Sequence, residues 1–193
     1  EQGATHAADG YARACNKPGV VLVTSGPGIT NCVTGIATAH MDSIPMIVIS
    51  GQVSRQYVGS DAFQEADATG ITRPICKHNF LINDRESIAD TFRKAFIIAT
   101  TGRPGPVIID IPKDLTDPNV KIDFEYKKNI KIRSYKIKTN EDDNKIEEAA
   151  KILCSAKKPM IYSGGGVILS KASKELIKLT KLLNYPITNT LMG

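Results

Sequence analysis

The sequence predicts an α/β protein, with a parallel sheet flanked by helices and the start of a second α/β domain behind it. Short apolar runs at 20–24, 45–51 and 107–111 lack alternating polar residues, which is typical of strands buried on both faces. Longer segments with helical spacing of apolar residues separate these runs. Strand, helix and strand in this order favour parallel strands joined by crossover helices.

The first elements follow one another closely. Residues 1–8 resemble a helix without a capping residue, and 20–24 is a β-branched strand. The loop 25–28 leads into a predicted helix over 29–41, and 45–51 forms the second strand. Parallel sheets bind ligands beyond the carboxyl ends of their strands, so the loops after these two strands are expected near a site.

The middle of the chain is less regular. Residues 52–74 are polar and small and predict irregular structure, whereas 86–100 has the apolar spacing of a helix. A Gly- and Pro-rich break at 102–106 precedes the third strand, which Pro112 closes. We therefore predict a first domain over 1–116.

The remaining chain changes character. Residues 117–140 are rich in Lys, Asn and Asp and predict an exposed linker. From 141 to 193 the pattern returns to a second α/β domain, truncated at its end. Its expected elements are helices at 142–155 and 171–183, strands at 160–162 and 185–190, and a glycine turn at 164–166.

Composition excludes several classes of protein. The 193 residues are 41% hydrophobic and 23% charged, as in globular proteins, and no apolar run approaches the ~20 residues of a membrane span. The net charge of +5 is concentrated around the expected linker, which does not favour nucleic-acid binding. Four cysteines without CxxC spacing indicate a reduced, cytoplasmic protein without a zinc ribbon. A chain that starts at Glu1 is expected to be a fragment of a longer one.

Two glycine-rich turns are the motifs that could bind a ligand. The turn at 25–28 lies between a buried strand and a helix, where free N–H groups favour an anion or a polar ring, although a tight turn without a ligand is equally compatible. The run Gly164, Gly165 and Gly166 could cradle a diphosphate or simply form a turn. It lacks the spacing of a Rossmann fingerprint because position 169 is Leu. The histidines predict no metal site.

Several separated motifs follow one another along the chain. They are Glu-Gln-Gly-Ala at 1–4, Ala-Asp-Gly-Tyr-Ala-Arg-Ala at 8–14, Thr-Ser-Gly-Pro-Gly-x-Thr-Asn at 24–31, Met-Asp-Ser-Ile-Pro at 41–45, Asp-Ala-Phe-Gln-Glu-Ala-Asp at 61–67, and Thr-Gly-Arg-Pro-Gly-Pro at 101–106 leading to Pro-Lys-Asp at 112–114. In this order they resemble the acetolactate synthase (acetohydroxyacid synthase) large catalytic subunit, a thiamine-diphosphate enzyme, with the bacterial biosynthetic isozymes as the best fit.

The resemblance implies a catalytic role for Glu1. This family holds a glutamate against a nitrogen of the cofactor's aminopyrimidine ring, and an apolar pocket lets such a carboxyl keep a proton. The imino form of the ring can then remove the proton from the thiazolium carbon, and the cofactor acts as an electron sink during decarboxylation. Pro27 and Asn31 match positions beside the pyrimidine, and Gln64 matches one close to the thiazolium.

Substrate and flavin contacts are implied in the same way. Phe63 matches a position that shapes the pocket for the second 2-ketoacid, and Lys113 matches a cation at the substrate entrance. Arg103 matches a position that contacts FAD, and Gly164, Gly165 and Gly166 match the start of the FAD-binding middle domain. A plug under the loop is the alternative for Phe63, and a solvated charge is the alternative for Lys113.

The implied reaction condenses two pyruvates to 2-acetolactate with loss of CO2, or joins pyruvate to 2-ketobutyrate, in branched-chain amino-acid biosynthesis. The implied enzyme is a transferase, a homodimer of catalytic subunits with a small regulatory subunit. The Mg2+ ligands of the family are expected outside this fragment, so the fragment alone is predicted to be inactive. The alternatives are a sister enzyme such as pyruvate oxidase, or a non-catalytic fragment that binds part of the cofactor.

Overall fold

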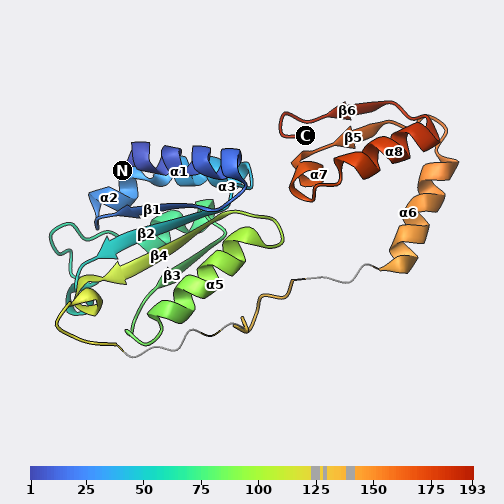
Figure 1. Cartoon of the computed structure of the whole chain (residues 1–193). Coiled ribbons are helices and arrows are strands. Elements are labelled where there is room, and N and C mark those ends of the chain that lie inside the picture. The colour runs from blue at the N-terminus through green and yellow to red at the C-terminus, as the bar shows by residue number, and fades with distance from the viewer. Residues whose placement is uncertain (123–126, 128–129, 138–141) are drawn as a thin grey trace. The chain divides into compact units, whose positions relative to one another are not determined.

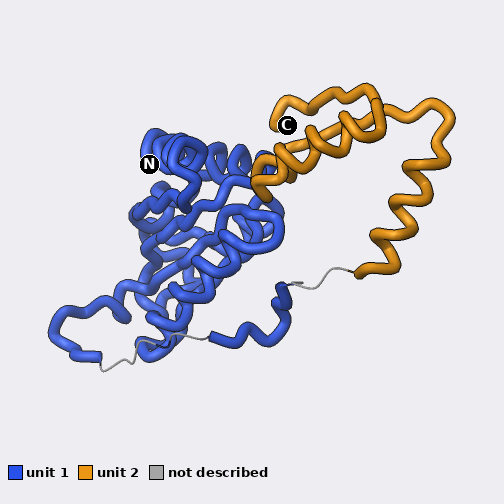
Figure 2. The backbone as a smooth tube through the Cα atoms, turned by 45° about the vertical axis from the view of Figure 1, so that its right-hand side comes forward, with its two compact units in different colours: residues 1–137 blue, residues 138–193 orange. Residues whose placement is uncertain are grey.

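Two units make up the chain. The computed structural model describes residues 1–122, 127, 130–137 and 142–193. Unit 1 comprises Glu1–Ile137 and unit 2 comprises Lys138–Gly193, shown in different colours in Figure 2. Along the described residues, no helix is both long and apolar enough to cross a membrane.

A parallel sheet forms the centre of unit 1 (Figure 1). Its strands, in spatial order, are β1 (Gly19–Val23), β2 (Met46–Gln52), β4 (Pro106–Pro112) and β3 (His78–Leu81). All neighbouring pairs are parallel, and the register places Val23 beside Ser50 and Ser50 beside Asp110. The carboxyl ends of β1, β2 and β4 therefore meet at one edge, and the predicted parallel sheet is confirmed.

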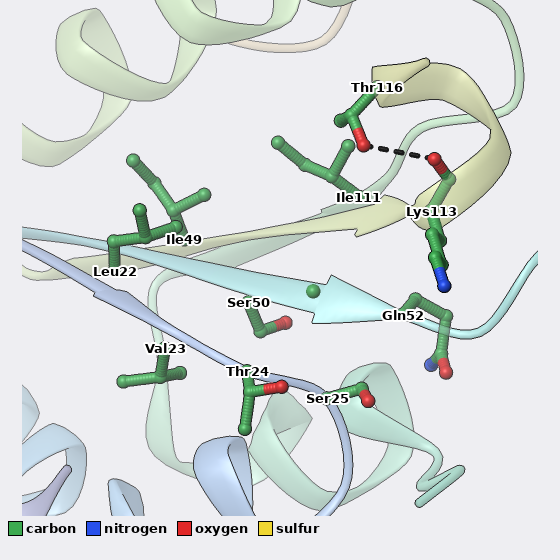
Figure 3. Close-up of a pocket in the computed structure, with 11 residues that line it drawn as sticks. Leu22, Val23, Thr24, Ser25, Ile49, Ser50, Gln52, Ile111, Lys113 and Thr116 are labelled. Carbon is green, nitrogen blue, oxygen red and sulfur yellow. Dashed lines mark hydrogen bonds between the residues drawn. The ribbon is translucent and has the colours of Figure 1, made fainter. Parts of the chain in front are cut away.

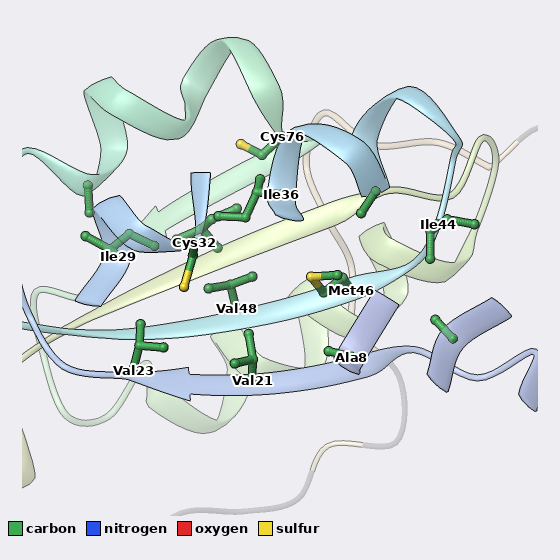
Figure 4. Close-up of a cluster of buried hydrophobic side chains, with 14 residues drawn as sticks. Ala8, Val21, Val23, Ile29, Cys32, Ile36, Ile44, Met46, Val48 and Cys76 are labelled. Carbon is green, nitrogen blue, oxygen red and sulfur yellow. The ribbon is translucent and has the colours of Figure 1, made fainter. Parts of the chain in front are cut away.

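One face of the sheet is covered by four helices: α1 (Gln2–Cys15), α2 (Pro27–Asn31), α3 (Val33–Met41) and α4 (Ala68–Thr72). Their small and branched side chains pack on alternate residues of the strands, as Figure 4 shows. Ile29, Ile36 and Val48 are at most 1% exposed in this cluster. Burial of such side chains contributes about 1.5–3 kcal/mol each.

The opposite face is covered mainly by α5 (Ile88–Thr100), which packs on β2, β3 and β4. Ile47, Val107 and Ile109 are fully buried beneath it. The strand β1 lies beyond its reach, so Val20 is 52% and Leu22 is 73% exposed. The prediction that the 20–24 run is buried on both faces is therefore wrong in this structure.

Several elements differ from the sequence prediction. The expected single helix over 29–41 is two helices, α2 and α3, which meet at Cys32. The 52–74 segment, predicted irregular, contains α4 and the short 3-10 helices η1 (Arg55–Tyr57) and η2 (Arg73–Ile75). A further short helix, η3 (Lys113–Thr116), follows β4. The strand β3 was not predicted at all.

The segment predicted as a linker, 117–140, lies partly outside the described residues. In its described part, Ile132 and Tyr135 pack against the core under α5. The Tyr135 hydroxyl donates to the Thr101 carbonyl over 2.8 Å and accepts from the Lys77 ammonium over 3.1 Å. This part of the segment is therefore fastened to unit 1.

Unit 2 is a small α/β arrangement with few buried groups. Its elements are α6 (Asp143–Ser155), β5 (Ile161–Ser163), α7 (Gly165–Leu169), α8 (Ser173–Leu183) and β6 (Ile187–Asn189). The two strands pair in parallel. The glycines predicted to form a turn begin the short helix α7. Over the described residues 142–193, Ser163 is the one buried residue.

Candidate active site

Glu1 and Asn31, thirty residues apart in sequence, meet at the carboxyl edge of the sheet. Glu1 is the residue before α1, and Asn31 ends α2, which follows β1. The Asn31 side-chain amide donates to the Glu1 carboxylate over 3.3 Å. The Glu1 carbonyl accepts from both the backbone N–H and the hydroxyl of Thr5, over 3.0 and 2.8 Å. The backbone of Glu1 is thus fixed, while Glu1 itself is exposed, so the described residues do not form the apolar pocket expected around its carboxyl group.

The turn before α2 brings a second predicted residue to this edge. Gly26 has a φ of +57°, a conformation that favours glycine. A Cβ atom on Gly26 would lie 2.5 Å from the Gln64 carbonyl oxygen, so the backbones of the two loops touch. Gln64 is itself left-handed, with a φ of +58°. Pro27, the first residue of α2, therefore stands next to the loop that carries Gln64.

The loop that carries Gln64 is held internally by Glu65. The Glu65 carboxylate accepts from the backbone N–H of Gly59 and, over 3.0 Å, from that of Ala62. These bonds lower the pKa of Glu65. Phe63, on the outside of the same turn, is 89% exposed. The structure therefore leaves the predicted aromatic side chain available for contact and does not bury it as a plug.

Behind these loops lies a buried polar network that the sequence analysis missed. Asp110, near the end of β4, is 2% exposed. Its carboxylate accepts from the Ser50 hydroxyl over 2.5 Å and from the Gln52 amide over 3.0 Å. Desolvation raises the pKa of Asp110 to about 6. The signal in the sequence was a lone acidic residue inside the apolar run 107–111.

Lys113 lies at a pocket of about 300 Å³ that Ser50 and Gln52 of this network also line (Figure 3). Leu22, Ile49 and Ile111 supply apolar walls, and Lys113 and Thr116 line it from η3. Of the predicted site residues, this pocket includes Lys113 but not Glu1, Pro27, Asn31 or Gln64.

A salt bridge fixes the short helix that begins at Lys113. The Arg55 backbone N–H and guanidinium donate to the Asp114 carboxylate over 2.9 and 2.7 Å. The backbone N–H of Arg55 is the largest cause that lowers the pKa of Asp114, and its guanidinium adds to it. The loops after β2 and β4 are thus tied together beside Lys113.

The structure does not bring Arg103 to this edge. Arg103 precedes β4, whose amino end lies at the opposite edge of the parallel sheet. Its guanidinium donates to the Ser43 hydroxyl over 2.8 Å and to the Met41 carbonyl over 3.3 Å. Arg103 therefore joins the end of α3 to the loop before β4.

The three consecutive glycines lie in unit 2, at the start of α7. Gly164 is the capping residue, and a Cβ atom on Gly165 would lie 2.9 Å from the Met192 carbonyl oxygen. The glycine at 165 is therefore explained by the close approach of the chain at 192. Among the described residues, no group of three or more His, Cys, Asp or Glu side chains is placed to hold a metal ion.

Comparison with known proteins gives two family matches and many similar sequences. Residues 1–71 match the N-terminal TPP binding domain of thiamine pyrophosphate enzymes, and residues 146–193 match their central domain. The chain is 58% identical over 193 residues to an acetolactate synthase large subunit of Buchnera aphidicola subsp. Schizaphis graminum, covering all of this chain and 34% of that protein. It is 49% identical over 193 residues, at the same coverage, to the acetolactate synthase isozyme 3 large subunit of Escherichia coli K12.

An archaeal protein gives a similar result. A probable acetolactate synthase large subunit of Methanocaldococcus jannaschii is 52% identical over 194 residues, with 33% of that protein covered. The chain thus spans about a third of the length of the curated relatives it matches. The similarity extends over both units.

Proposed function

Because the chain belongs to the thiamine pyrophosphate enzymes, we propose that it is part of an acetolactate synthase large subunit. The proposed reaction condenses two pyruvates to 2-acetolactate and CO2, or pyruvate with 2-ketobutyrate, in branched-chain amino-acid biosynthesis. In this proposal residues 1–116 form the pyrimidine-binding domain, 117–140 a linker, and 141–193 the start of the middle domain. The observation that carries the proposal is the contact between Glu1 and Asn31 at the carboxyl edge of the sheet.

The residues at this edge suit the aminopyrimidine ring of thiamine diphosphate. A carboxyl group can share a proton with a ring nitrogen, and a side-chain amide can both donate and accept. Glu1 and Asn31 provide these two groups 3.3 Å apart. The backbone turn at Gly26 and the ring of Pro27 lie at the start of the same short helix. The bound cofactor would supply a carbon centre that adds to 2-ketoacids and accepts the electron pair left by CO2.

Each of the candidate site residues then has a defined role. Glu1 would exchange a proton with the ring nitrogen of the bound cofactor, and Asn31 keeps the Glu1 side chain in place. Gln64, in a strained left-handed conformation, presents its amide beside the reacting centre. The exposed ring of Phe63 contacts the alkyl group of the second 2-ketoacid. Lys113, on the separate loop after β4, attracts the carboxylates of the substrates.

We further propose that the whole protein binds FAD and Mg2+. Arg103 and the glycines at 164–166 would approach FAD. Arg103 has five N–H donors, of which two are directed to Ser43 and Met41. The ligands of Mg2+ would come from outside these 193 residues. The proposed assembly is a cytoplasmic homodimer with a small regulatory subunit. Flavin absorbance of the purified full-length protein tests whether it binds FAD.

The test of the proposed reaction is the substitution Glu1→Gln in the full-length protein. Glutamine keeps the size of the side chain but cannot supply the proton. We expect acetolactate formation, measured by a colour assay, to fall by about 100-fold or more, a loss in the range for removal of a general acid–base group. Undiminished activity in this variant would refute the role of Glu1. We expect the 193-residue segment by itself to form no acetolactate.

A further inference from the structure

We propose that Gln52 and Asp110 are positioning residues that hold the loop of residues 53–66, and with it Gln64, against the turn at Gly26. This inference rests on the proposed function, because Gln64 matters to catalysis only if that function is right. The bond from Gln52 to the Ala66 carbonyl, supported from behind by Asp110, carries the argument. Neither residue is among those that the sequence resemblance singles out.

Every polar atom of the Gln52 side chain has a partner. The amide nitrogen donates to the Asp110 carboxylate over 3.0 Å and to the Ala66 carbonyl over 2.9 Å. The amide oxygen accepts from the Val53 backbone N–H over 2.8 Å. If the amide were turned over, its oxygen would face the Ala66 carbonyl and the Asp110 carboxylate, which are both acceptors. The side chain, which is 6% exposed, therefore has one favourable orientation.

Asp110 determines that orientation. One carboxylate oxygen accepts from Ser50 and the other from Gln52, so the carboxylate bridges β4 to the end of β2. Burying a carboxylate in a sheet is costly, and Asp67 nearby adds repulsion to the desolvation of Asp110. An apolar side chain at this position would avoid that cost. What the carboxylate provides is an acceptor that fixes the amide of Gln52.

The Ala66 carbonyl is the point at which the loop returns to the sheet. Two residues earlier, the Gln64 carbonyl lies against Gly26, close enough that a Cβ atom there would overlap it. Between these two points, Glu65 ties the turn to Gly59 and Ala62. The turn is thus closed on itself, and the bond from Gln52 to the Ala66 carbonyl fastens its end to β2. Arg55 holds the other end of the loop through Asp114 and the Asn83 carbonyl, so loss of the bond from Gln52 releases the end that carries Gln64.

The experiment measures hydrogen exchange and kinetics of the full-length protein with Gln52→Met. Methionine fills a similar volume but cannot donate to Ala66 or Asp110. We expect the amides of Gly59, Ala62 and Glu65 to exchange about tenfold faster, in line with the loss of a buried hydrogen bond. We also expect kcat for acetolactate formation to fall about tenfold. The KM for pyruvate should change less than about twofold, because methionine keeps the volume of Gln52 beside Lys113 and the Arg55–Asp114 salt bridge still fixes the helix that carries Lys113.

One further variant controls for general damage to the fold, and another tests the role of Asp110. Asn79 also donates its side-chain amide to a backbone carbonyl, that of Thr69, over 2.9 Å. Asn79→Leu should speed exchange near Thr69 but leave the 53–66 loop and kcat unchanged. Asp110→Leu removes the acceptor that orients the Gln52 amide, so it should speed exchange in the 53–66 loop and lower kcat in the same direction as Gln52→Met. If Gln52→Met does not fold, Gln52→Asn replaces it in the experiment. Asparagine keeps an amide group, but its shorter side chain cannot reach both Asp110 and Ala66.

The outcomes separate this inference from the proposed function. Unchanged exchange in the 53–66 loop of the Gln52 variants would overturn the inference. Faster exchange with unchanged kcat would also overturn it, because the loop would then be held without consequence for catalysis. If the original protein forms no acetolactate, the proposed function fails, and the exchange data still decide whether Gln52 holds the loop.

Discussion

Asp110 is a carboxylate whose surroundings favour its protonated form. Desolvation raises its pKa from 3.8 to about 6, while hydrogen bonds from Ser50 and Gln52 oppose the rise. Between these two pH values the folded chain binds a proton that the unfolded chain does not. This group therefore contributes stability below about pH 4, and the contribution is lost as the pH rises through about 6.

The substitution Asp110→Asn should remove this dependence. The pKa shift corresponds to about 3 kcal/mol of unfolding free energy between the two limits. Urea unfolding at several pH values would measure it. We expect the stability of the variant, relative to that of the original chain, to rise by about this amount between pH 4 and pH 7. If the free energy of unfolding depends on pH in the same way in both proteins, the raised pKa of Asp110 is contradicted.

The sequence allows the position of some site residues to be predicted, but not that of others. The glycine turn at 25–28 follows an apolar run, so its place at the carboxyl edge could be predicted from the order of the elements. The pairing of Glu1 with Asn31 depends on how α1 packs across β1, which local spacing does not encode. Gln52 follows one apolar run and Asp110 lies inside another, and only the strand register brings them together.

At the scale of elements, the backbone of α1 is in close contact with the beginning of β1 at Gly19. A Cβ atom on Gly19 would lie 2.1 Å from the Ala8 carbonyl oxygen. A real side chain there would have to push the helix away from the strand. Since α1 carries Glu1 at its start, this close approach also helps to place the candidate site.

We expect Gly19→Ala to lower the free energy of unfolding by about 1–3 kcal/mol, the usual cost of overpacking. Gly10, on α1, is a matched control because a Cβ atom there would meet nothing within 4 Å. Gly10→Ala should raise stability by up to ~1 kcal/mol through helix propensity. Urea unfolding followed by circular dichroism measures both, and a Gly19→Ala chain as stable as the original would show that the helix can shift freely.

The elements that the sequence predicted well are those with a continuous apolar signal. The runs at 20–24, 45–51 and 107–111 correspond to β1, β2 and β4. The strand β3 has four residues, two of them His and Asn, so it lacks such a run. Its strand conformation comes from pairing with β4. The helix α7 was obscured by the glycines at its start.

At the scale of the whole molecule, the two units differ in how much apolar surface they bury. Unit 1 has two core clusters, one on each face of its sheet. Unit 2 exposes large apolar side chains such as Ile152 at 61%, Tyr162 at 71% and Leu182 at 80%. A unit with so little buried apolar area has little to offset the entropy of folding.

We therefore expect residues 138–193, produced separately, to bind the dye ANS strongly and to melt without a cooperative transition. Residues 1–137 should show a sharp thermal transition and weak dye binding, and they serve as the comparison. Calorimetry and dye fluorescence are the measurements. A cooperative transition in the shorter piece would mean that its exposed residues are not needed for a stable core.

Among the described residues, β1 is one of the two edge strands of its sheet, and it exposes Val20 and Leu22, with no charged residue along its length. Strands of this kind offer a template to which other chains adhere. We therefore expect the isolated chain to self-associate through β1 at high protein concentration. Placing a lysine at position 22 would be a direct way to keep it dispersed in solution.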